Sequence, residues 1–234
     1  MTAPVLIGID GGATKISGAG IRRDPRTGQF TFRSEPVEIP LASTDSFSPE
    51  FKPVDLQSQL QDLSRGEFHL TEAEIRQGTA FVEATRQVIR SCVPGDSSPP
   101  ILVGIGLPGL KTADRRGISA MANGPRMPEF CADLERLLRR DSISLLAPIH
   151  HLGSDADYCG LGEEYAEEGA FTGWEHAYYL GGGTGAADAL KLKGVLLPLD
   201  ATKDWLAKTW ELQSPEGLSM ERFASAGGIQ AVYA

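Results

Sequence analysis

The sequence predicts an α/β fold in which one order of elements occurs twice. A continuous apolar run at residues 5–10 breaks at a glycine turn and resumes at residues 15–22, as expected for a strand hairpin. A second glycine-rich turn lies between expected strands at residues 177–180 and 189–193. Helical periodicity separates the two hairpins, so we infer a duplicated α/β unit with its boundary within residues 140–152.

The first half contains one strongly marked helix. Thr71 and Glu74 have the spacing of a capping box, and apolar or small residues follow at helical intervals until Pro94 and Gly95. Residues 40–70, rich in Ser, Pro, Asp and Gln, show no sustained period and are interpreted as a long surface excursion. The other expected elements of this half are a turn, two strands and a short helix, at residues 24–28, 30–38, 101–106 and 129–139.

The second half is expected to begin with a short strand at residues 150–154 and a helix at residues 155–168. Residues 198–217 contain two prolines and are interpreted as a loop region. A last helix is expected from residue 219 onward. The pair Gly227-Gly228 lies within that helix, where ordinary helix packing explains it.

Composition excludes several classes of protein. The 234 residues include 22 Lys and Arg against 31 Asp and Glu, a net charge of −9, and an acidic chain repels the phosphate backbone of nucleic acids. Cys92, Cys131 and Cys159 are far apart, which argues against a disulfide scaffold and fits a reducing cytoplasm. Neither a signal peptide nor a membrane span is recognisable. We therefore expect a cytoplasmic protein without zinc, a nucleic-acid partner or a membrane partner.

Glycine is over-represented: 27 of the 234 residues, about 12%, are glycine, against a usual share of about 7%. The first glycine turn follows Asp10 and continues through Gly12 and Thr14 to Lys15. Small residues let backbone N–H groups approach an anion, while the hydroxyl and the ammonium add further donors. Asp10 suits such a site if hydrated Mg²⁺ accompanies a phosphate. The alternative is a hairpin turn without a ligand.

A second turn of this kind contains Gly183, Thr184 and Gly185. Gly181, Gly182 and Gly183 are three successive glycines, which are also found where a chain turns sharply without a ligand, so this turn alone is weak evidence for a ligand. Two glycine–threonine hairpins in one chain are stronger evidence, because they could hold a polyphosphate from opposite sides of a cleft.

Asp155 lies where an expected strand gives way to a helix. An aspartate at this place is a good N-cap, which is one interpretation. The other is a general base that takes a proton from a substrate hydroxyl, a role that an ordinary ionised carboxylate can fill.

These motifs together resemble the ROK family of sugar kinases. In chain order they are Ile9-Asp10-Gly11-Gly12-Ala13-Thr14-Lys15, Gly104-Ile-Gly-Leu-Pro-Gly109, Asn123 ahead of Pro128, Ser154-Asp-Ala-Asp-Tyr-Cys-Gly-Leu-Gly-Glu163, and Gly183-Thr-Gly185 followed by Gly194. The family belongs to the actin/hexokinase/Hsp70-like ATPase superfamily. The resemblance implies two ribonuclease-H-like α/β domains around a cleft, at residues 1–148 and 149–234, with the second domain incomplete at its C-terminal end.

The resemblance also implies roles for individual residues. Asp10 matches the aspartate that organises Mg²⁺, Asp155 the catalytic base that contacts the substrate, and Asn123 falls near an asparagine that holds sugar hydroxyls. The remaining matched residues belong to the two phosphate motifs: Gly12, Thr14 and Lys15 in the first, and Gly183, Thr184 and Gly185 in the second.

Several residues depart from the family pattern. Ala13 replaces a glycine of the first phosphate turn, Asp157 replaces an asparagine, and Asp188 stands where the second phosphate motif has further glycine. A carboxylate beside a triphosphate is unfavourable unless a cation intervenes. The Gly-His element and the cysteine-rich zinc motif of the family are absent from the sequence.

The function that the resemblance implies is phosphorylation of a sugar hydroxyl by ATP and Mg²⁺, as in a glucokinase-like hexose kinase. The alternative is a catalytically inactive relative that binds a sugar or a partner protein. Repressors of the same family carry an N-terminal DNA-binding segment, and the first phosphate strand at residue 5 leaves no room for one. A small-molecule sugar is thus the expected partner, and the resemblance also allows a homodimer.

Overall fold

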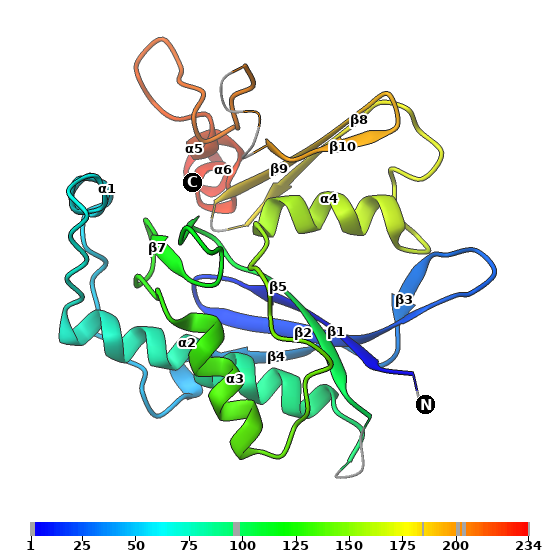
Figure 1. The fold of residues 1–234 in the computed structure, drawn as a ribbon. Coiled ribbons are helices and arrows are strands. Elements are labelled where there is room, and N and C mark those ends of the chain that lie inside the picture. The colour runs from blue at the N-terminus through cyan, green and yellow to red at the C-terminus, as the bar shows by residue number, and fades with distance from the viewer. Residues whose placement is uncertain (1–2, 96–98, 184, 200–201, 203–204, 234) are drawn as a thin grey trace. The chain divides into compact units, whose positions relative to one another are not determined.

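The computed structural model describes residues 3–95, 99–183, 185–199, 202 and 205–233, and it divides the chain into two compact units (Figure 1). Unit 1 comprises Met1–Arg23 and Thr31–Ser154, and unit 2 comprises Asp24–Phe30 and Asp155–Ala234. The hairpin tip that follows the second strand therefore groups with the C-terminal part of the chain. The domain boundary at residues 148 and 149 stays a prediction.

Unit 1 is built on a mixed sheet. Its strands β1 (Val5–Gly11) and β2 (Lys15–Arg23) pair antiparallel, which confirms the expected first hairpin. Strand β5 (Ile101–Gly106) runs parallel to β1 on the other side. Two short strands, β3 (Phe30–Phe32) and β4 (Val37–Pro40), both neighbour β2. Beyond β5, isolated parallel bridges continue the sheet into the segment that precedes Asp155.

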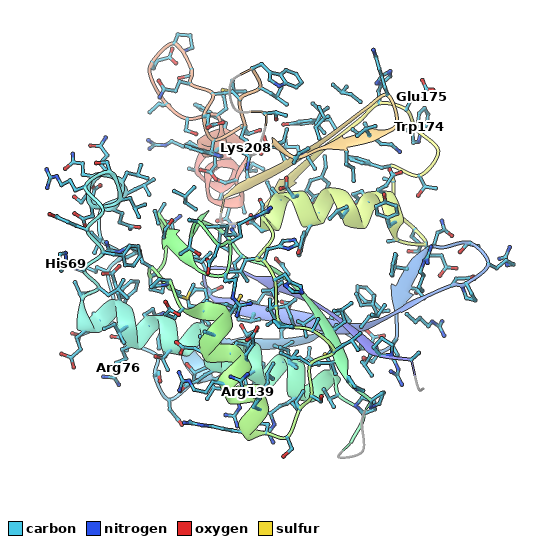
Figure 2. All side chains as sticks on the ribbon, viewed as in Figure 1. His69, Arg76, Arg139, Trp174, Glu175 and Lys208 are labelled. Atoms are coloured by element: carbon cyan, nitrogen blue, oxygen red, sulfur yellow. The ribbon has the colours of Figure 1, made fainter. Side chains whose placement is uncertain are left out.

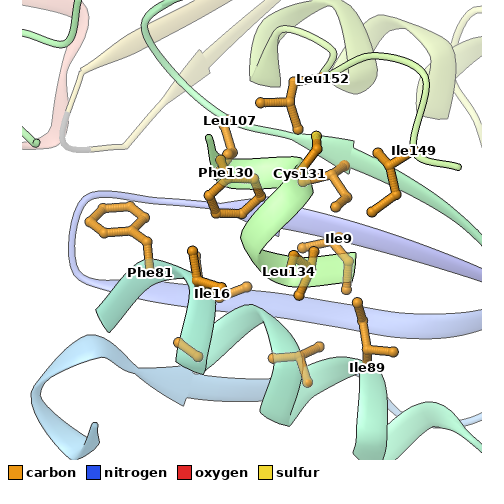
Figure 3. Close-up of a cluster of buried hydrophobic side chains, with 14 of the residues drawn as sticks. Ile9, Ile16, Phe81, Ile89, Leu107, Phe130, Cys131, Leu134, Ile149 and Leu152 are labelled. Carbon is orange, nitrogen blue, oxygen red and sulfur yellow. The ribbon is translucent and has the colours of Figure 1, made fainter. Parts of the chain in front are cut away.

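One face of this sheet is covered by α2 (Glu72–Cys92), against which α3 (Phe130–Arg140) packs (Figure 1). The capping box of α2 is present as predicted, because Thr71 and Glu74 exchange side-chain and backbone hydrogen bonds. Figure 3 shows the core between sheet and helices. Among its fully or almost fully buried apolar side chains are Ile9, Ile16, Phe81, Ile89, Leu107, Phe130, Cys131, Leu134, Ile149 and Leu152.

Between β4 and α2 the structure differs from the prediction of an unstructured excursion. A 3₁₀ turn, η1 (Leu41–Ser43), and a helix, α1 (Leu56–Ser64), lie in this segment. Asp55 caps α1 by accepting a hydrogen bond from the Ser58 N–H at 3.0 Å. Leu56, Leu60 and Leu63 recur at helical spacing in α1, a signal that the prediction overlooked, and Gln59 is the one buried residue of the helix.

Two other sequence-based boundaries were wrong. The strand expected at residues 30–38 is interrupted between β3 and β4, where Pro36 lacks the N–H that a continuous ladder needs. The strand expected at residues 150–154 consists only of a bridge between Gly106 and Gly153. A small two-stranded sheet of β6 (Leu110–Lys111) and β7 (Ile118–Ala120) was not predicted, because its strands are too short to show alternation.

Unit 2 contains an antiparallel sheet in the order β10-β9-β8. The turn between β8 (Ala177–Gly182) and β9 (Ala186–Leu192) is the second glycine turn, and β10 (Val195–Leu197) follows. Helix α4 (Asp155–Tyr165) packs on β9, and a Cβ at its Gly160 would lie 2.5 Å from the Ala189 Cβ. The close approach of helix and strand therefore requires glycine at that position.

The C-terminal part of unit 2 ends in two short helices, α5 (Glu221–Ala224) and α6 (Ala226–Tyr233). Gly227 and Gly228 lie in α6, as predicted. A Cβ on Gly228 would come within 1.6 Å of the Arg222 carbonyl oxygen, so the pair of helices packs closely at this residue. Among the described residues, no helix combines the length and the apolar character needed to cross a bilayer.

Gly18 in β2 provides a test of how tightly the unit 1 sheet meets α2. A Cβ there would lie 2.6 Å from Ile9 Cδ1, 2.7 Å from Val88 Cγ1 and 2.8 Å from the Gly8 carbonyl oxygen. We expect Gly18→Ala to lower the free energy of unfolding by about 1–3 kcal/mol, because buried neighbours must move. Gly104→Ala in β5 is the matched control, since a Cβ there meets nothing within 4 Å. Equal urea midpoints for the two variants would contradict this packing.

Candidate functional site

The carboxyl ends of adjacent strands in unit 1 place the first candidate residues. Asp10 on β1 is in register with Gly106 on β5, and Gly106 forms a bridge with Gly153. These three residues stand in a row at the edge where parallel strands end, the usual position of ligand sites in α/β proteins. Asp10 is exposed there. Asp155, two residues after Gly153, begins the second segment of unit 2.

The first glycine turn is closed by a backbone hydrogen bond of 2.9 Å from the Gly12 N–H to the Lys15 carbonyl. Ala13 is not among the residues with a positive φ, so its Cβ fits this turn without strain. The departure from the glycine of the family pattern is thereby explained. The Thr14 carbonyl accepts from the Leu41 N–H at 2.9 Å, which joins the turn to η1.

Lys15 forms an ion pair with Glu38. Its ammonium donates to Glu38 Oε1 at 2.5 Å across β2 and β4, and this hydrogen bond holds the pKa of the Glu38 carboxyl below its ordinary value. Both side chains are about half exposed. A phosphate at the turn would therefore share this ammonium with Glu38.

A pocket of about 320 Å³ lies within unit 1 beside the first glycine turn. It brings together Thr14 and Asn123, which the sequence analysis had assigned to phosphate and sugar binding. The lining comes from the turn, η1 and the loop after it, α2, and the loop before α3: Ala13, Thr14, Ala42, Phe47, Ser48, Pro49, Phe51, Pro53, Gln77, Phe81, Asn123, Gly124 and Pro125.

The pocket combines a mainly apolar lining with a few polar side chains, as small-molecule sites do. Ser48, Gln77 and Asn123 are polar, and Thr14 adds a hydroxyl. Gln77 Oε1 accepts from the Ser48 N–H at 3.1 Å, so the carboxamide is oriented by the opposite wall. No sequence motif pointed to Ser48 and Gln77, because only the tertiary fold brings the segment after η1 against α2.

Asp155 starts α4, and its Oδ1 accepts a hydrogen bond of 3.0 Å from the Ala156 N–H. A carboxylate in the first turn of a helix is favourably placed toward the positive end of the helix dipole. This position suits either a structural carboxylate or a general base, and the role of Asp155 stays a prediction.

At the second glycine turn, the Gly183 N–H donates to the Gly185 carbonyl at 2.8 Å. Thr184 lies outside the described residues. Beside the turn, Glu221 Oε1 accepts from the Ala186 N–H at 2.9 Å. The backbone donor at the end of this turn is thus occupied by the Glu221 carboxylate. Glu221 was missed, because no motif in the sequence linked it to the turn.

Asp188 on β9 is almost completely buried and is held by two donors. Its Oδ2 accepts from the Thr209 N–H at 2.5 Å and from the Tyr178 hydroxyl at 3.1 Å. Burial, together with the nearby Asp188 charge, raises the pKa of Tyr178. The Asp188 carboxylate therefore belongs to a hydrogen-bonded network inside unit 2.

The chemistry of the donors is compatible with Mg²⁺ at Asp10. In the described part of the chain, no three His, Cys, Asp or Glu side chains gather in a way that could hold a metal ion. Mg²⁺ needs no such cage, since one carboxylate, waters and substrate phosphates suffice. Cys131 is buried, and desolvation raises the pKa of its thiol to about 12. The expectation that the chain binds no zinc stays a prediction.

No protein-family model and no curated protein sequence matches the chain. Solved structures do. An inorganic polyphosphate/ATP-glucomannokinase from Arthrobacter sp. strain KM superposes with a TM-score of 0.62 at 21% identity, covering 99% of this chain and 72% of that chain. A ROK family glucokinase from Streptomyces griseus, in complex with glucose and AMPPNP, gives 0.56 at 16% identity, covering 96% and 58%. The chain has the fold of the ROK sugar kinases.

The ROK fold also occurs in a transcriptional regulator, a homolog of the E. coli MLC protein, with a TM-score of 0.50 at 12% identity. That match covers 97% of this chain and 48% of the regulator. The chain therefore spans between about half and three quarters of these three ROK-fold proteins. The expected α/β fold class is confirmed.

Proposed function

We propose that the protein phosphorylates a hydroxyl group of a sugar, with ATP as phosphoryl donor. The observation that carries the proposal is the pocket of about 320 Å³ that Thr14 and Asn123 share in unit 1. Since one fold serves kinases and a regulator, the fold does not select the function, whereas a small-molecule pocket beside a phosphate-type turn favours a kinase. The proposed partner is a small-molecule sugar, and the proposed location is the cytoplasm.

In this proposal the two glycine turns bind the polyphosphate of ATP. The donors are the Thr14 and Thr184 hydroxyls and the Lys15 ammonium, since the Gly12 and Gly183 N–H groups already donate within their own turns. Phosphoryl transfer depends on positioning and charge neutralisation more than on covalent catalysis by the protein. Bound Mg²⁺, held through Asp10, would neutralise phosphate charge.

The Asn123 carboxamide binds hydroxyl groups of the sugar in the pocket, and Asp155 acts as general base. The carboxylate removes the proton from the acceptor hydroxyl as its oxygen bonds to the γ-phosphorus, and the bond from that phosphorus to the β–γ bridging oxygen breaks to release ADP. The proposal therefore requires that Asp155 of unit 2 reach the sugar bound in unit 1.

Phosphorus NMR of the chain with Mg²⁺, ATP and D-glucose, D-mannose or N-acetyl-D-glucosamine tests the proposal. We expect one sugar to give ADP and a sugar-phosphate resonance together, in equal amounts. ADP with inorganic phosphate alone would indicate hydrolysis of ATP without phosphoryl transfer to the sugar, and would contradict the proposal. No turnover with any sugar would contradict the kinase proposal and leave the catalytically inactive relative.

A further inference from the structure

The loop that carries Asn123 is held at both ends by buried polar contacts. Met121 lies at its start and Arg126 at its end, and both are almost completely buried. Asn123, Gly124 and Pro125 between them line the pocket. The side chain of Met121 also fixes the middle of the loop, because a Cβ on Gly124 would lie 2.1 Å from the Met121 sulfur.

Gln59 of α1 holds the start of this loop. Its Oε1 accepts from the Met121 N–H at 2.8 Å, and its Nε2 donates to the Met121 carbonyl at 3.0 Å. The same Nε2 donates to the Val54 carbonyl at 2.7 Å, next to Pro53 on another wall of the pocket. One fully buried carboxamide thus joins two walls of the pocket by three hydrogen bonds.

Arg126 holds the end of the loop. Its guanidinium makes two hydrogen bonds of 2.7 Å to the carboxylate of Glu74 in α2 and a third, of 2.8 Å, to the carbonyl of His69. It also pairs with Asp62 of α1 at 3.3 Å. His69 lies in the connection between α1 and α2 (Figure 2).

Gln59 and Asp62 are three residues apart on α1, so they lie on the same face of that helix. The helix therefore contacts both ends of the Asn123 loop through side chains of one face. Leu56 and Leu63 of α1 are half-buried, and the one buried residue of the helix is the polar Gln59, so polar contacts carry part of its attachment. The polar contacts of α1, from Gln59 and Asp62, are made with Met121 and Arg126 at the two ends of the pocket loop.

We propose that Gln59 is a positioning residue for the sugar pocket: it fixes Met121, and through Met121 the conformation in which Asn123 meets the sugar. The inference rests on the proposed function, since it takes the pocket occupant to be a sugar. Gln59 itself does not line the pocket. Its effect is therefore on the affinity for the sugar and not on nucleotide binding.

The test compares Gln59→Met with Gln61→Met, a substitution at an exposed glutamine of the same helix. Methionine keeps the length of the side chain and removes all three hydrogen bonds. We expect Gln59→Met to raise KM for the best of D-glucose, D-mannose and N-acetyl-D-glucosamine by about 10- to 100-fold, because a displaced binding loop loses its alignment. KM for ATP and all constants of Gln61→Met should stay within about twofold of the parent.

A parallel rise in the KM values for sugar and ATP, or unchanged values for both, would overturn the inference. If the parent itself neither binds nor phosphorylates any of the three sugars, the proposed function fails instead. Should Gln59→Met not fold, Gln59→Asn tests the same residue, since the shorter carboxamide stays polar but cannot make all three hydrogen bonds. It should raise KM for the sugar by about twofold to fivefold, and an unchanged value would overturn the inference.

Discussion

Replacing Asp155 with asparagine is expected to lower kcat by about 100- to 10,000-fold while the affinity for the sugar changes far less. Asparagine keeps the size of the side chain and its ability to accept the hydrogen bond from the Ala156 N–H. It cannot take a proton from the acceptor hydroxyl. The loss should therefore appear in steady-state turnover and in single-turnover rates alike.

Asp157→Asn is the matched control, because Asp157 is the other acidic residue in the first turn of α4. Both substitutions remove one negative charge from the same helix end, so both change the interaction with the helix dipole similarly. Turnover of Asp155→Asn within a few-fold of the Asp157→Asn value would leave Asp155 a structural residue and would remove the proposed base.

Replacing Arg126 with methionine is expected to lower the free energy of unfolding by about 3–5 kcal/mol, because Glu74 would remain buried without its partner. Both side chains of the pair are almost inaccessible to solvent. Arg126 also stacks on Phe68, with the guanidinium carbon 5.5 Å from the ring centre. Arg136→Met is the control, since its pair with Asp133 is exposed and should contribute about 0–1 kcal/mol.

The free energy of unfolding is expected to change with pH in opposite directions in the parent and in Arg126→Met. Burial alone would raise the pKa of Glu74, but hydrogen bonds from Arg126 and Thr71 outweigh it and hold that pKa below its ordinary value. The parent should therefore lose stability as the pH falls toward the folded-state pKa, because protonation breaks the pair. In Arg126→Met the unpaired carboxyl has a raised pKa, so acidification should recover stability. Parallel pH profiles in urea denaturation would contradict this role of Arg126.

The sequence predicted those elements whose signals are local. The β1–β2 hairpin follows from an apolar run on either side of a glycine turn, and the start of α2 follows from Thr71 and Glu74. Helix α1 gave a weaker local signal, three leucines at helical spacing within a polar segment. Its single buried residue is a glutamine whose partner, Met121, lies far away in the sequence, so neither composition nor periodicity could reveal the contact.

In the candidate site, too, only residues that belong to local sequence motifs were predicted. Thr14 and Asn123 were chosen from motifs, and the structure brings them to one pocket. The pocket walls formed by Phe47, Ser48 and Gln77 were not predicted, because these residues come together only after the segment following η1 folds against α2. Glu221 was overlooked for the same reason, since its contact with Ala186 joins elements distant in the chain.

Calorimetric titration of the chain with D-glucose, D-mannose, N-acetyl-D-glucosamine and Mg–ATP tests whether the protein binds both substrates of a sugar kinase. The account predicts that one sugar and Mg–ATP each bind with one molecule per chain. It also predicts that Asn123→Ala abolishes the heat of sugar binding and leaves that of Mg–ATP unchanged. Binding of a sugar without Mg–ATP would favour an inactive relative over a kinase. Sugar binding that is unaffected by Asn123→Ala, or no binding of any of these ligands, would contradict the account.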